Sequence, residues 1–71
     1  MEKFKLRGDF IKLDALLKVV GIAPSGGMAK MFILDELVKV NGEVALQRGK
    51  KIRAGDVVEV DLEGTPRIEV E

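Results

Sequence analysis

The chain has 71 residues and a formal net charge of zero, from 12 basic and 12 acidic side chains, so it can form one small domain with a thin core. It contains no cysteine and no histidine, which excludes disulfides, thiolate nucleophiles, the usual zinc ligands and the usual general base near neutral pH. We therefore expect no catalysis, no metal site and no cofactor.

The first predicted elements are a short strand and a helix. Phe4 and Leu6 alternate with lysines, as in a half-buried strand. Apolar side chains then recur at i, i+3, i+4 and i+7, which predicts a helix that Gly21 ends; they are Leu13, Leu16, Leu17 and Val20.

The charged start MEKFKLRGD is unlike a signal peptide, and no apolar stretch approaches the ~20 residues of a membrane span. We expect a cytoplasmic protein.

A second helix is predicted to begin at Gly26. Pro24 disfavours helical geometry in the residue before it, and Ser25 is a good N-cap. The helix should run to about Leu34 or Asp35, with its core side formed by Ala29, Phe32 and Ile33.

Strands are predicted for the rest of the chain. The pair Asn41-Gly42 between two alternating runs is a strong hairpin signal. A basic loop, RGKK, a tight turn at residues 54–56, another strand and a final edge strand follow. This order predicts a single α+β domain, residues 1–71, in which two N-terminal helices pack on a small antiparallel sheet.

The start of the second predicted helix could bind an anion. The first backbone N–H groups of a helix lack internal partners and carry a partial positive charge, which suits phosphate. Gly26 and Gly27 leave the approach open, Lys30 follows one turn later, and Met28 replaces the carboxylate of a capping box. The alternative is a capped helix whose glycines only permit a tight turn.

Basic residues are concentrated in the first part of the chain. Met1 to Arg53 contains 11 basic and 6 acidic residues, a balance of +5, whereas Ala54 to Glu71 contains 1 and 6, a balance of −5. If both predicted helix starts and the basic loop share one face, they form a surface for a nucleic-acid backbone; otherwise the loop is a solvated turn. The three phenylalanines, Phe4, Phe10 and Phe32, are expected in the core, so base stacking has little support.

Three stretches, IKLDALLKVVGIAPSGGMAK, VKVNGEV and RGKKIRAGDVVEV, resemble the RNA-binding domain named after small-subunit ribosomal protein S-four. The resemblance covers about residues 4–60 and is strongest to short stand-alone bacterial members of the YaaA type. It implies the α+β fold with an alpha-L motif and the binding of structured RNA, often ribosomal RNA. The residues that it implies for RNA binding are Lys12, Ser25, Gly26, Gly27, Lys30, Lys39, Arg48, Lys50 and Lys51. Asn41 matches the pattern too, but we expect it to serve the turn.

Apolar residues stand at several positions where similar chains carry polar ones, and they favour an alternative function. Position 36, usually glycine in similar chains, is Glu36 here. A contiguous apolar strip on a small domain marks an interface, and methionine suits one. The alternative is a protein-binding or homodimeric module on the same scaffold, natural or engineered, or a strip covered by the chain itself. Its residues would be Met28, Met31, Leu34, Leu37 and Leu46.

Overall fold

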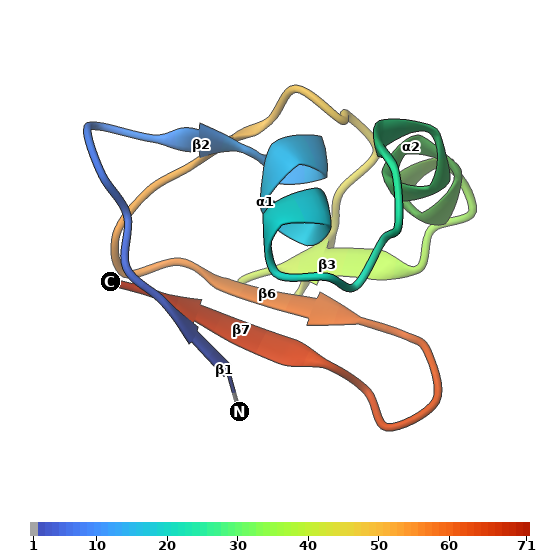
Figure 1. Ribbon diagram of the computed structural model, residues 1–71. Coiled ribbons are helices and arrows are strands. Elements are labelled where there is room, and N and C mark those ends of the chain that lie inside the picture. Colours follow the sequence, from blue (N-terminus) through green and yellow to red (C-terminus); the bar gives the residue numbers. More distant parts are fainter. Residues whose placement is uncertain (1) are drawn as a thin grey trace.

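The computed structural model describes residues 2–71 and contains two helices and seven short strands (Figure 1). The elements in chain order are β1 (Glu2–Phe4), β2 (Ile11–Lys12), α1 (Leu13–Val19), α2 (Gly26–Leu34), β3 (Val38–Val40), β4 (Glu43–Val44), β5 (Lys51–Ile52), β6 (Val57–Val60) and β7 (Arg67–Val70). Both helices have the bounds that the apolar periodicity and the Pro24-Ser25 pair predict, within a residue.

The strands form a five-stranded sheet in the order β1-β7-β6-β3-β4 and a separate two-stranded ribbon of β2 and β5. The sheet is mixed, because β1 pairs with β7 in parallel while the other neighbours are antiparallel. Two main-chain hydrogen bonds extend this parallel pairing, from Leu6 N to Glu71 O and from Glu71 N to Phe4 O, both 2.8 Å. The two ends of the chain are therefore joined side by side.

The predicted architecture of two N-terminal helices on a small antiparallel sheet is wrong. Two strands precede α1, the sheet is mixed, and a second ribbon lies outside it. The final strand, β7, is expected at an edge but lies between β1 and β6. The reason is that β1 pairs with a strand more than 60 residues further along the chain, and local turn signals carry no information about such a pairing.

Two turns have the backbone geometry that the residues within them predict. Asn41 and Gly42 have φ of 52° and 86°, which is the geometry of the type I′ turn that suits a two-residue hairpin. Helix α1 ends before Gly21, whose φ is 82°. Both predictions are confirmed.

Helix α2 ends in a Schellman motif whose left-handed residue is not glycine. The amide of Glu36 donates to the carbonyl of Ile33, and the amide of Leu37 donates to the carbonyl of Phe32, both at 3.1 Å. Glu36 has a φ of 62°, a conformation that costs an L residue with a Cβ roughly 1–2 kcal/mol. The apolar character of Leu37 follows from the same motif, because the residue after the left-handed one packs back against the last turn of the helix.

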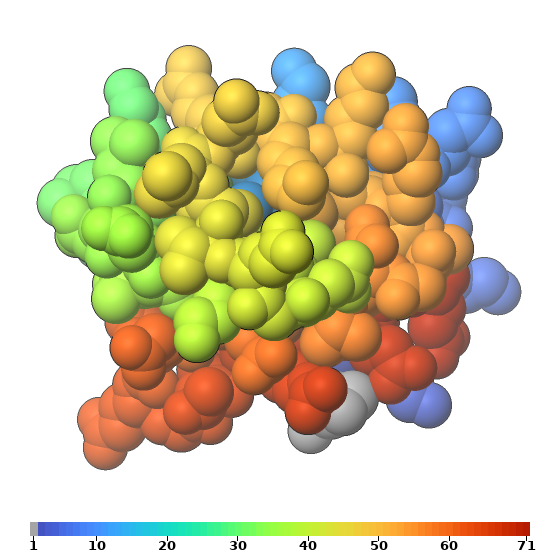
Figure 2. Space-filling model, turned by 180° about the vertical axis from the view of Figure 1, so that it is seen from behind, coloured from blue at the N-terminus to red at the C-terminus, as the bar shows by residue number. Residues whose placement is uncertain are grey.

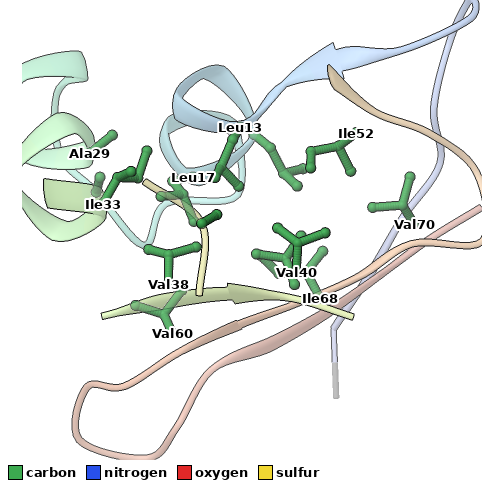
Figure 3. Packing of buried hydrophobic residues seen from close by; sticks show 14 residues of the cluster. Leu13, Leu17, Ala29, Ile33, Val38, Val40, Ile52, Val60, Ile68 and Val70 are labelled. Atoms are coloured by element: carbon green, nitrogen blue, oxygen red, sulfur yellow. The ribbon is translucent and has the colours of Figure 1, made fainter. Parts of the chain in front are cut away.

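The core lies between the two helices and the inner face of the five-stranded sheet (Figure 3). Leu13 of α1 lies near Ile52 at one end, and Ala29 and Ile33 of α2 lie above Val38 at the other end. The side chains that are at most 1% exposed are Leu13, Leu16, Leu17, Ala23, Ala29, Ile33, Val38, Ile52, Val58, Val60, Ile68 and Val70. One thin layer of aliphatic side chains therefore holds the helices at a fixed position on the sheet.

Candidate functional site

Helix α2 begins with a side-chain cap and an open N-terminus. Ser25 is extended, with φ −151° and ψ 166°, and its Oγ accepts a hydrogen bond of 3.2 Å from the Met28 amide. No acidic side chain lies in the first turn. This end of the helix therefore keeps its partial positive charge.

The amides of Gly26 and Gly27 are available to a ligand. Both residues are exposed, and in residues 2–71 no protein acceptor forms a hydrogen bond with either amide. A Cβ added at Gly26 would meet nothing within 4 Å, and one at Gly27 would meet only Ser25 Oγ at 3.8 Å. Lys30 is exposed and lies four residues after Gly26, on the same side of the helix. Two N–H donors and the positive end of the helix dipole thus face solvent, with Lys30 one turn further along the same side, and we call these three residues, Gly26, Gly27 and Lys30, the α2 start.

The start of α1 is covered by the chain itself. The amide of Leu13 donates to the carbonyl of Lys50 at 2.9 Å, and the amide of Asp14 donates to the carbonyl of Arg48 at 3.1 Å. These bonds use the N–H groups that would otherwise meet a ligand. These two amides of α1 therefore cannot bind a ligand, but they hold the basic loop at the N-terminus of the helix.

Four basic side chains gather beside this anchor, and we call them the basic edge: Lys12, Arg48, Lys50 and Lys51. All four are exposed. In the antiparallel β2–β5 ribbon, Lys12 lies directly opposite Lys51, and like charges in that position are destabilising. Within residues 2–71, the ion pairs of 4 Å or less include none of these four side chains. The basic edge therefore carries four positive charges that make no close ion pair within the described residues, although the charge of Lys50 also acts on Asp56.

The basic edge and the α2 start lie at the same end of the molecule. In Figure 1 the β2 strand, the first turns of both helices and the loop before β5 lie along the top of the view, away from β6 and β7. Figure 2 shows the molecule from behind, where the β3–β4 hairpin and the following loop cover much of the visible face and α2 lies at one side. The pairing of β2 with β5 was not predicted, although Ile11-Lys12 and Lys51-Ile52 share the alternation of apolar and basic residues.

Lys39 lies elsewhere. It projects from the outer face of the sheet, because its neighbours Val38 and Val40 are buried on the inner face. Across the strands Lys39 is opposite Glu59, and Glu59 is opposite Arg67. Alternating charges in such a row compensate one another. The structure thus separates Lys39 from the α2 start and the basic edge.

Asn41 and Asp56 join the hairpin turn to the turn before β6. Asn41 Nδ2 donates to Asp56 Oδ1 at 3.0 Å, and Asn41 Oδ1 accepts from the Val57 amide at 2.9 Å. The Arg53 amide donates to Asp56 Oδ2 at 2.8 Å. That backbone hydrogen bond is the main cause that lowers the pKa of Asp56, with smaller contributions from Asn41 and from the charges of Lys50 and Arg53. Asn41 is thus part of a structural clamp.

The apolar residues of the alternative hypothesis fall into two groups. Met31, Leu34 and Leu46 are each more than half exposed, at 55%, 58% and 57%. Met28 is half-buried and packs against the core, and Leu37 is half-buried at the end of α2. Met31 and Leu34, three residues apart, leave an apolar strip along one side of α2, whereas Leu46 lies in the loop after β4.

Two negative observations concern the whole of residues 2–71. Neither helix there has the length and hydropathy that crossing a membrane requires. Acidic side chains in this part of the chain do not form a group of three or more that could hold a metal ion.

Two similarities to known proteins cover most of the chain. The family model described as "S4 domain" matches residues 4–70. A protein of Bacillus subtilis (strain 168) that is called "Probable ribosome maturation protein RlbA" is 43% identical over 53 residues, which make up 75% of this chain and 75% of that protein. The family match extends past the region of resemblance seen in the sequence and includes β7.

Proposed function

The chain belongs to the S4 domain family, and on this premise we propose that it binds structured RNA, without catalysis, through the α2 start and the basic edge. The observation that carries the proposal is the Lys12–Lys51 pair, two lysines opposite each other with no acidic partner within 4 Å in the described chain. A polyanion laid across the ribbon would relieve this repulsion and release its own counterions.

The arrangement suits a phosphate backbone rather than a small anion. The α2 start offers the amides of Gly26 and Gly27 to one phosphate, with Lys30 beside them. The basic edge adds point charges from elements at the same end of the molecule (Figure 1). Double-stranded RNA is recognised mostly through shape and backbone contacts, so separate contacts of this kind would track one strand of a folded RNA.

Ribosomal RNA is the RNA class that we propose. The support is the Bacillus subtilis relative, whose name describes a probable ribosome maturation protein and which shares 43% of 53 aligned residues. The test is fluorescence anisotropy with a labelled ribosomal RNA stem-loop over a series of salt concentrations. Binding that weakens steeply with salt supports phosphate contacts, whereas a flat response or no binding contradicts the proposal.

A second candidate function is protein binding through the apolar strip of α2. The observation that favours it is the exposure of Met31 and Leu34, which are 55% and 58% exposed on adjacent turns. Replacement Met31→Asp should then abolish association measured by analytical ultracentrifugation and leave the fold intact. Association that is unchanged by Met31→Asp removes this candidate.

A further inference from the structure

Phe10 lies at the surface, although the sequence predicts it in the core. Its side chain is 39% exposed, whereas Phe4 and Phe32 pack against the buried cluster. It stands directly before β2, so it is next to the strand that carries Lys12. An exposed aromatic ring in this position was missed because single-sequence reasoning assigns a phenylalanine to the core by default.

The surroundings of Phe10 are basic. Phe10 lines an open hollow with Lys3, Lys5 and Arg7, and the other lining residues that the structure describes are apolar: Phe4, Leu6 and Ile11. Lys3 makes an exposed ion pair of 3.7 Å with Glu71. The other two cations of the hollow, Lys5 and Arg7, have no ion-pair partner within 4 Å in residues 2–71. The hollow therefore attracts anions beside an accessible ring.

Lys51 connects this hollow to the basic edge. Its Nζ lies 4.9 Å from the centroid of the Phe10 ring, a cation–π contact. The same lysine faces Lys12 across the ribbon. A strand of RNA that follows the basic edge would therefore reach the Phe10 ring within the span of one lysine side chain.

We propose that Phe10 is a stacking platform for an unpaired RNA base, with the phosphates on either side held by Lys5, Arg7 and Lys51. This inference rests on the proposed RNA-binding function and gives it a preference for a junction between paired and unpaired RNA. Bases inside a helix cannot reach an aromatic side chain, whereas unpaired bases stack on one readily. The long side chain of Lys51 moves from the ring to a neighbouring phosphate when the base takes its place.

The experiment compares two labelled RNA duplexes of the same sequence, one blunt and one with a single-stranded adenosine tail. In fluorescence anisotropy the tail should raise the affinity of the unaltered chain about tenfold, the order that stacking of a base on an aromatic side chain supplies. Phe10→Leu keeps an apolar side chain but removes the ring, so it should lose the gain from the tail and bind the blunt duplex as before. Phe10→Tyr keeps the ring and should keep the gain.

A second measurement observes the ring directly. The chain has three phenylalanines and neither tyrosine nor tryptophan, so its aromatic NMR spectrum is simple enough to assign. The Phe10 ring protons should shift upfield with the tailed duplex and much less with the blunt one.

The outcomes separate this inference from the function beneath it. If the unaltered chain binds both duplexes equally, or if Phe10→Leu keeps the gain from the tail, stacking on Phe10 is refuted and RNA binding by the basic edge stands. If the unaltered chain binds neither duplex, both proposals fall.

Discussion

Removing the two facing lysines should weaken RNA binding by an amount that the structure sets. Each lysine or arginine that neutralises a phosphate changes the slope of log K against log salt by about −0.9 on a duplex. The basic edge and Lys30 supply five such side chains, so we expect a slope of about −4 to −5 for the unaltered chain. The double variant Lys12→Gln/Lys51→Gln should change it to about −3.

The same relation gives the loss of affinity at one salt concentration. Near physiological salt, one lost phosphate contact costs about fivefold and two cost about thirtyfold. Stability should change little, because relief of the Lys12–Lys51 repulsion, roughly 0.2–1 kcal/mol, is offset by loss of the Lys51–Phe10 contact, worth roughly 0.5–1 kcal/mol. Urea denaturation checks this, so that weaker binding cannot be attributed to unfolding.

The matched control is Lys39→Gln/Arg67→Gln. It makes the same change of net charge, but both side chains project from the outer face of the sheet in the row with Glu59. Exposed charges that lie more than a Debye length of about 8 Å from the bound RNA are largely screened at physiological salt, so we expect affinity to stay within about twofold and the slope not to change. Equal losses from both double variants would refute the reasoning, because binding would then depend on net charge and not on position.

Three further predictions test other parts of the structure. Gly27→Glu puts a carboxylate at the α2 start, where its Cβ meets only Ser25 Oγ at 3.8 Å. The free energy of unfolding, measured by urea denaturation, should rise by roughly 0.5 kcal/mol or more, while the RNA affinity, measured by anisotropy, should fall about tenfold. Glu36→Gly removes a side chain from a position with φ 62° and should raise the free energy of unfolding, measured by urea denaturation, by about 1 kcal/mol without affecting RNA binding. No gain in stability would contradict the strain inferred there. The lowered pKa of Asp56 means that its ionised form favours the folded state. The stability that it contributes is therefore present above the unfolded pKa of about 4 and is lost as pH falls through the lower folded value. The denaturation midpoint of Asp56→Asn should depend less on pH in that window than the midpoint of the unaltered chain, and identical pH profiles would contradict the role of the clamp.

Sequence reasoning succeeded where a few adjacent residues decide the structure. Pro24 and Ser25 fix the first residue of α2, and Asn41-Gly42 fixes the hairpin, because each pair determines its own backbone conformation. The type I′ turn needs positive φ at both positions, a requirement that Asn-Gly meets with little strain. The α2 start is therefore predictable from the sequence alone.

Sequence reasoning failed where residues far apart in the chain meet. The parallel pairing of β1 with β7 and the ribbon of β2 with β5 join segments separated by tens of residues, and their strands are too short for a periodic signal. Those pairings make the sheet mixed and place Lys12 opposite Lys51. The exposure of Phe10 and the separation of Lys39 from the other predicted residues also depend on which strands become neighbours.

The most direct test of the central claim follows the glycine amides by NMR during titration with a ribosomal RNA stem-loop. The amides of Gly26 and Gly27 are open at the α2 start, Gly49 lies between Arg48 and Lys50, and Gly64 lies in the turn between β6 and β7. If the α2 start and the basic edge bind the phosphate backbone, the signals of Gly26, Gly27 and Gly49 shift with RNA and that of Gly64 does not. Shifts centred on Gly64, with Gly26 and Gly27 unmoved, would contradict the account.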